Sequence, residues 1–233
     1  MEKPDILLDG SYSYSESGLF YTQENFKLLS YPQSQMLQMK SEIMARTDMG
    51  EFLKIVVNLE MNSHYLPVAM TIERSLGKRY SMESFKVDLV RLETSYVFKN
   101  SESEQQHKKP FNIRSYLTSP AISTSALFSL TKKWDLTGRT PIILVNSNNI
   151  WNYDGPPVDK TVYGEFNAID LAKFEINGQS YTASHLCIYE QDSHGKQSEQ
   201  PVNFYINKQY GIPYQVISGS RRIVLSKIKF FTP

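Results

Sequence analysis

The chain has 233 residues, 40% of them apolar, and a formal net charge of +1. These values are ordinary for a globular protein of one large or two small domains. Because 25 basic residues are balanced by 24 acidic ones, the charge excludes the strongly basic surface typical of nucleic-acid-binding proteins. No apolar run approaches the roughly 18 residues of a membrane-spanning helix, so we expect no transmembrane segment.

Alternating apolar and polar residues predict β-strands along most of the chain. In the clearest run, Phe52 to Met61, the odd-numbered residues are apolar, while Lys54, Asn58 and Glu60 fall on the other face. The same pattern predicts strands at 10–16, 24–31, 35–46, 67–74, 78–90, 91–99, 141–153, 158–166, 168–176, 179–190, 202–207, 212–218 and 221–231. The polar stretches 100–109 and 191–200 read as solvated loops.

One segment departs from the strand pattern and predicts a helix over residues 119–133. Ser119 suits a helix N-cap and Pro120 suits the first helical position. Apolar residues then recur at helical spacing up to Trp134, and Gly138 provides a stop.

These elements predict an all-β protein, mainly an antiparallel β-barrel or half-barrel, with one short helix around residues 119–133. Closure into a barrel removes the reactive edges that about a dozen strands in an open sheet would leave. We see no internal repeat or linker, and we expect residues 1–233 to form a single domain.

The dipeptide Asn177-Gly178 predicts a two-residue hairpin turn, because both central residues of a type I′ turn need positive φ. This turn would pair Ile176 with Gln179, Phe174 with Tyr181 and Ala172 with Ala183. Continued by twos, the register pairs Asp170 with His185, on the same face as Phe174 and Tyr181.

The Asp170–His185 pair has three interpretations. It can satisfy itself inside a barrel; it can contact a ligand together with Phe174 and Tyr181; or Asp170 can orient His185, with Cys187 as a nucleophile two residues along the same face. A buried polar pair most often forms only a hydrogen bond between its own two members, and we assign no catalytic residue.

Two further features suit ligand contact. Trp151 and Tyr153 lie in an Asn-rich tract, where stacking and amide hydrogen bonds could hold a sugar, although such tracts are more often a strand end and a turn. All eight methionines lie within the first 82 residues, and a Met-rich inner face could contact acyl chains or simply fill the core.

Metal and cofactor sites have little support in the sequence. His64, His107, His185 and His194 are widely spaced, and none belongs to a cluster with metal-ligand spacing. Gly-rich phosphate-binding loops and the GxSxG elbow are absent from the sequence. We expect neither a metal nor a cofactor.

The C-terminal half, about residues 119–230, resembles a bacterial envelope family of unknown function. The resemblance rests on an order of events: a short helix from Ser119 leading to Asp135-Leu136-Thr137-Gly138, the strand 141–153, the hairpin at Asn177-Gly178, then the strand Val202–Ile206 and a Pro213-containing strand. It implies a wrapped antiparallel β-barrel exported to the periplasm, with an envelope-integrity protein and lipoprotein carriers as relatives. The paired cysteines of the envelope-integrity relatives cannot exist here, because Cys187 is the one cysteine.

Three functions follow as hypotheses. The first is a non-enzymatic envelope protein that binds a lipid or other apolar small molecule on the concave face of its sheet. The second is a protein-interaction or structural module with a packed core and an envelope protein as partner. The third is a hydrolase or transferase that uses Asp170, His185 and Cys187. The start of the chain lacks a signal peptide, so we expect a periplasmic location if Met1 replaces a removed signal, and a cytoplasmic one otherwise.

Overall fold

A computed structural model describes residues 2–47, 49–135, 138–191 and 197–231, without the side chains of residues 168–171. Its strands are β1 (Asp5–Glu16), β2 (Leu19–Tyr31), β3 (Met36–Arg46), β4 (Phe52–Asn62), β5 (Pro67–Leu76), β6 (Arg79–Asp88), β7 (Glu93–Asn100), β8 (Glu104–Pro110), β9 (Ser115–Leu117), β10 (Thr140–Asn146), β11 (Val158–Ile176), β12 (Gln179–Glu190), β13 (Val202–Ile206), β14 (Pro213–Ser218) and β15 (Arg221–Phe230).

All described strands belong to one 15-stranded sheet, which confirms the predicted all-β fold class. From one edge of the sheet to the other, the strands stand in the order β8, β7, β6, β5, β4, β3, β2, β1, β15, β14, β13, β12, β11, β10, β9. Every neighbouring pair is antiparallel except β9 and β10, which are parallel. The division of the chain into domains stays a prediction.

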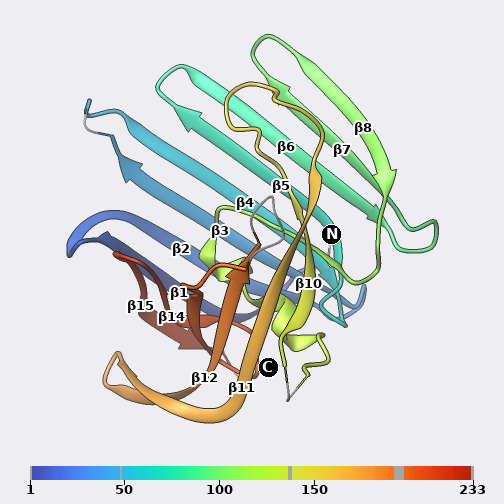
Figure 1. The fold of residues 1–233 in the computed structure, drawn as a ribbon. Helices are drawn as coiled ribbons and strands as arrows, with labels where there is room; N and C mark the ends of the chain where they lie inside the picture. Colours follow the sequence, from blue (N-terminus) through green and yellow to red (C-terminus); the bar gives the residue numbers. More distant parts are fainter. Residues whose placement is uncertain (1, 48, 136–137, 192–196, 232–233) are drawn as a thin grey trace.

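The sheet wraps so that its two ends overlap. Strands β1 to β8 form a broad curved layer, and β9 to β12 cross in front of it (Figure 1). The edge strands β8 and β9 are not neighbours in the sheet, whereas β9 lies against β5. The alternating apolar faces predicted from the sequence point inward, and they form the main core between the two layers.

The predicted helical segment is present as two 3-10 turns, η1 (Ile122–Thr124) and η2 (Leu127–Leu130), instead of one continuous helix. Both turns lie inside the wrapped sheet (Figure 1). Buried residues Ala126 and Phe128 form a second core cluster with inward-facing residues of β10 to β14.

Three predicted boundaries were wrong. The polar stretch 100–109 contains strand β8, which pairs with β7 over its whole length. Strands predicted at 158–166 and 168–176 are one continuous strand, β11. The strand predicted at 141–153 ends at Asn146, and a loop follows.

The predicted Asn177-Gly178 turn is confirmed, with φ of 53° and 73° at its two residues. The register also holds as far as Ala172 opposite Ala183. Beyond that point it was wrong, because β11 bulges between Asn167 and Ala172. The bulges place Asn167 opposite His185 and Asp170 opposite Ser184.

Candidate functional site

A buried carboxylate anchors the segment that crosses the inside of the sheet. This crossing segment comprises residues 118–130, which follow β9 and include η1 and η2. Glu24 of β2 accepts the backbone N–H groups of Ile122 at 2.8 Å and Ser123 at 3.1 Å. The Tyr14 hydroxyl donates to the same carboxylate, and the hydroxyls of Ser123 and Ser41 are 2.5 Å apart. Burial raises the pKa of Glu24. These bonds hold η1 against β2 and β3, so the interior is divided rather than filled evenly.

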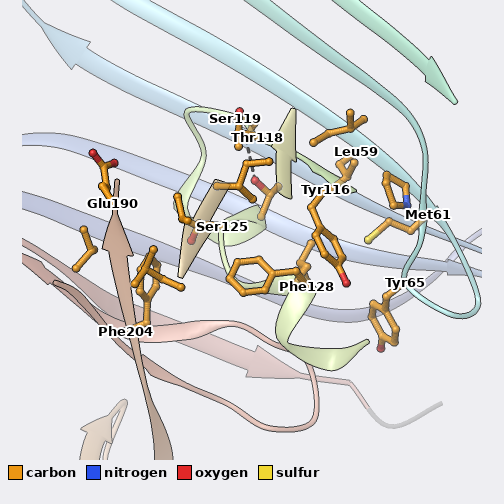
Figure 2. Close-up of a pocket in the computed structure, with 18 residues that line it drawn as sticks. Leu59, Met61, Tyr65, Tyr116, Thr118, Ser119, Ser125, Phe128, Glu190 and Phe204 are labelled. Atoms are coloured by element: carbon orange, nitrogen blue, oxygen red, sulfur yellow. Dashed lines mark hydrogen bonds between the residues drawn. The ribbon is translucent and has the colours of Figure 1, made fainter. Parts of the chain in front are cut away.

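A cavity of about 210 Å³ lies on one side of this segment, between β4 and the layer formed by β10 to β13. It is lined by Leu59, Met61, Tyr65, Pro67, Tyr116, Leu117, Thr118, Ser119, Thr124, Ser125, Leu127, Phe128, Leu144, Val162, Ile188, Glu190, Val202 and Phe204. Figure 2 shows Phe128 near its centre, with Met61 and Tyr65 at one end and Phe204 and Glu190 at the other. We call this space the apolar cavity.

The Ser and Thr hydroxyl groups of the apolar cavity already have hydrogen-bond partners in the protein. The hydroxyls of Ser119 and Thr124 are 2.8 Å apart, and the Thr118 hydroxyl donates to the Val145 carbonyl oxygen at 3.0 Å. The Ser125 hydroxyl donates to the Ile122 carbonyl oxygen at 2.6 Å. Since these hydroxyls already have partners, the cavity suits a ligand without strong hydrogen-bonding groups.

A second cavity, of about 630 Å³, lies on the other side of the crossing segment. Its floor comes from β4, β5 and β6, and its roof comes from residues 118–120 and 146–151. In Figure 1 the loop after β10 curls over β5 and β6. The lining residues are Leu53, Ile55, Ile72, Arg74, Leu76, Glu83, Thr118, Ser119, Pro120, Asn146, Ser147, Asn148, Asn149, Ile150 and Trp151. We call it the amphipathic cavity, because it combines an apolar floor with a buried ion pair.

The ion pair in its floor is almost fully buried. Arg74 Nη1 lies 2.6 Å from Glu83 Oε1, and the two side chains are 9% and 0% exposed. The second oxygen of Glu83 accepts the Tyr96 hydroxyl at 2.8 Å, and that hydroxyl in turn accepts from Asn149 Nδ2 at 2.7 Å. Burial raises the pKa of Tyr96, so it stays a neutral donor. The network fixes the loop over the cavity to β6 and β7.

His185 lies on a different surface from the two cavities. Its ring stacks on Tyr205, with centroids 4.9 Å apart, and its Nε2 lies 3.0 Å from Asn203 Oδ1. Cys187 Sγ is 3.5 Å from both the His185 Nε2 and the Asn203 Oδ1. The side chain of Asp170 lies outside the described residues, and its backbone is opposite Ser184 instead of His185.

This arrangement does not provide a base for Cys187. The nearer contact of His185 Nε2 is an amide oxygen, which can only accept, so this contact favours the tautomer with its proton on Nε2, and that tautomer cannot take a proton from the thiol. Burial, and then the nearby Glu165 carboxylate, raise the pKa of Cys187. Both effects favour the unreactive thiol over the nucleophilic thiolate.

Phe174 and Tyr181, which were also predicted to contact a ligand, lie together in an aromatic cluster. Phe174 packs on Tyr205 and Tyr214, and Tyr181 packs on Tyr214 and Phe230, so both belong to an aromatic cluster that lines neither cavity.

The two aromatic residues of the Asn-rich tract lie in different surroundings. Trp151 lines the amphipathic cavity, and its carbonyl oxygen accepts from Asn100 Nδ2 at 3.0 Å. Tyr153 stacks on His107, with centroids 5.4 Å apart, and the Tyr153 hydroxyl bonds to the ring Nε2. Among the predicted contact residues whose side chains the structure describes, Trp151 is therefore the one that lines either of these two cavities.

Sequence reasoning missed Glu24, Arg74 and Glu83. Their signal was present, because each stands in phase with the apolar residues of its strand: Glu24 precedes Phe26, Arg74 follows Ile72, and Glu83 precedes Phe85. A charged residue on the inward face of a strand must find a partner.

Within the residues that the structure describes, no group of three or more His, Cys, Asp or Glu side chains is arranged to hold a metal ion. No helix among them is long and apolar enough to cross a membrane.

No family model and no curated protein matches the chain. Among solved structures, it is similar to a β-barrel-like protein of the domain of unknown function DUF1849 from Brucella abortus, with a TM-score of 0.60, 11% identity and 98% of each chain covered. It is also similar to a DUF1089 family protein from Pseudomonas aeruginosa, with a TM-score of 0.53, 11% identity, and 86% of this chain and 90% of that chain covered. The protein therefore shares the β-barrel-like fold of these uncharacterised proteins.

Proposed function

We propose that the protein binds an apolar or amphipathic small molecule, such as a lipid, in the apolar cavity and performs no chemistry on it. The observation that supports this is a cavity lined mainly by aliphatic and aromatic side chains, whose Ser and Thr hydroxyl groups already bond to protein partners. An acyl segment of about six methylenes buried there would gain about 5 kcal/mol at roughly 0.8 kcal/mol per methylene. Part of that gain is offset by the cost of association.

Two alternatives receive less support. An enzyme based on Cys187 would need a base for its thiol, and His185, the described histidine beside it, already contacts the Asn203 amide oxygen through Nε2. A protein-interaction module would need an accessible sheet edge, but β8 carries Glu104, Lys108, Lys109 and Pro110, which discourage pairing with another strand.

Filling the apolar cavity tests the proposal. Leu144 lines it, so Leu144→Trp should weaken binding of a naturally fluorescent fatty acid by about tenfold or more, because the indole ring takes the ligand's volume. The matched control is Ile143→Trp, since the neighbouring side chain points to the opposite face of β10. Equal affinity of both variants and the parent protein, or no uptake by the parent protein, would contradict the proposal.

The proposal includes a place in the bacterial envelope, which is motivated by the resemblance of residues 119–230 to an envelope family. Fractionation of cells that express the chain natively tests this part. Recovery with a periplasmic or membrane marker is expected, and recovery with a cytoplasmic marker would contradict it.

A further inference from the structure

We propose that the amphipathic cavity is a separate binding site for an amphiphile with an anionic oxygen headgroup, a carboxylate or a phosphate monoester, and that Arg74 holds that headgroup. This inference concerns the other side of the crossing segment from the apolar cavity. It does not depend on what the apolar cavity binds.

The first argument is the unused hydrogen-bonding capacity of Arg74. A guanidinium carries five N–H donors, yet Arg74 contacts Glu83 through Nη1 alone. No other hydrogen-bond partner of Arg74 occurs in the described part of the chain. Arg74 lines the cavity with a side chain that is only 9% exposed. Its other guanidinium nitrogens are not among the fully buried polar atoms that lack a partner in the described residues, so they stay accessible beside the cavity that Arg74 lines. A nearly buried cation with spare donors calls for an acceptor.

The second argument is the state of Glu83. One of its oxygens is taken by Arg74 and the other by the Tyr96 hydroxyl. Both oxygens of this fully buried carboxylate therefore already have a protein partner, and the guanidinium is the charged group with more donors left to recognise a ligand. Its planar fork matches the two oxygens of a carboxylate or phosphate.

The third argument is the shape of the remaining wall. Leu53, Ile55, Ile72 and Leu76 form an apolar strip from beside Arg74 to the ends of β4 and β5. Ile150 and Trp151 cover this strip from the loop above. Ile150 stays exposed at the edge of this cover. A headgroup on Arg74 would therefore leave its chain on the apolar strip, with an exit toward solvent.

Calorimetric titration with decanoate, decanol and decyl phosphate tests the site. Decanoate should bind the parent protein about tenfold or more tightly than decanol, because hydrogen bonds to a charged partner are the stronger kind. Decyl phosphate separates the two sources of the headgroup: tighter binding than decanoate points to lipid phosphates, and weaker binding points to free carboxylates. Equal binding of decanol and decanoate, or no binding of either anion, would overturn the proposal.

Variants locate the headgroup. Arg74→Met alone would leave Glu83 buried without its partner, so the test uses the double variant Arg74→Met/Glu83→Gln, which should lose the preference for decanoate over decanol. The single variant Glu83→Gln keeps the cation and should keep or increase the preference. Arg79→Met, at an exposed position on β6, should change nothing. If the double variant still prefers decanoate over decanol, the headgroup does not lie on Arg74. If Leu144→Trp loses that preference, the anion binds in the apolar cavity. Either result would overturn the proposal.

Discussion

Glu24 is a carboxylate with no exposed surface, and it accepts hydrogen bonds from Tyr14, Ile122 and Ser123. Although these bonds favour the charged form, loss of hydration outweighs them, and the pKa of Glu24 is raised. One residue thus joins β1, β2 and η1 and also carries an electrostatic cost at high pH.

This cost gives the stability of the protein a defined pH dependence. A folded-state pKa above the unfolded one means that the folded state binds the proton more tightly. The contribution of Glu24 is therefore fully present below its ordinary pKa of 4.5 and is lost as pH rises through the raised folded-state pKa. We expect the unfolding free energy of the parent protein minus that of Glu24→Gln to decrease as pH rises above 4.5.

Urea unfolding of both proteins at several pH values measures that difference, and the other titrating groups cancel in it. A difference that grows with pH would mean that the hydrogen bonds to the carboxylate outweigh its desolvation.

At the scale of the elements, the centre of the wrapped sheet is packed tightly around a glycine. Gly10 of β1 lies opposite Phe26 of β2 and Ile228 of β15. A Cβ atom at Gly10 would lie 2.7 Å from both the Lys227 carbonyl oxygen and Phe26 Cζ. The Phe26 ring, stacked on Tyr12 with centroids 5.0 Å apart, thus occupies the space that a side chain at position 10 would need.

Gly10→Ala should therefore lower the unfolding free energy by about 1–3 kcal/mol, the usual cost of overpacking. Gly138→Ala serves as the control, because its added Cβ would meet nothing closer than 3.5 Å, and it should stay within about 0.5 kcal/mol of the parent protein. Equal stability of the two variants would mean that Phe26 moves aside without cost.

The elements also show what the sequence could predict. The Asn177-Gly178 turn was predictable, because its two residues tolerate the positive φ that the turn requires. The bulges of β11 were not, since they depend on how its long ladder with β12 bends, which no local residue pattern encodes. The sequence did not predict strand β8, because this edge strand is polar on both faces and lacks the alternating pattern. The two cavities could not be read from the sequence, because they depend on where the crossing segment sits between distant strands.

At the scale of the whole molecule, the wrapped sheet encloses a segment of its own chain that does not fill the interior. The crossing segment 118–130 is held to the wall at Glu24 and leaves a cavity on each side. Thr118 and Ser119 line both cavities. These two cavities inside the wrapped sheet are the basis of the function proposed here.

The most direct test of that function is to identify by mass spectrometry any small molecule that co-purifies with the protein. We would purify it gently from its native host or a close substitute, extract it with organic solvent, and analyse the extract and the intact protein by mass spectrometry. The account predicts a co-purifying lipid or other apolar molecule at near one-to-one stoichiometry, which Leu144→Trp diminishes and Ile143→Trp does not. An empty extract, together with an intact mass equal to that of the bare chain, would contradict it.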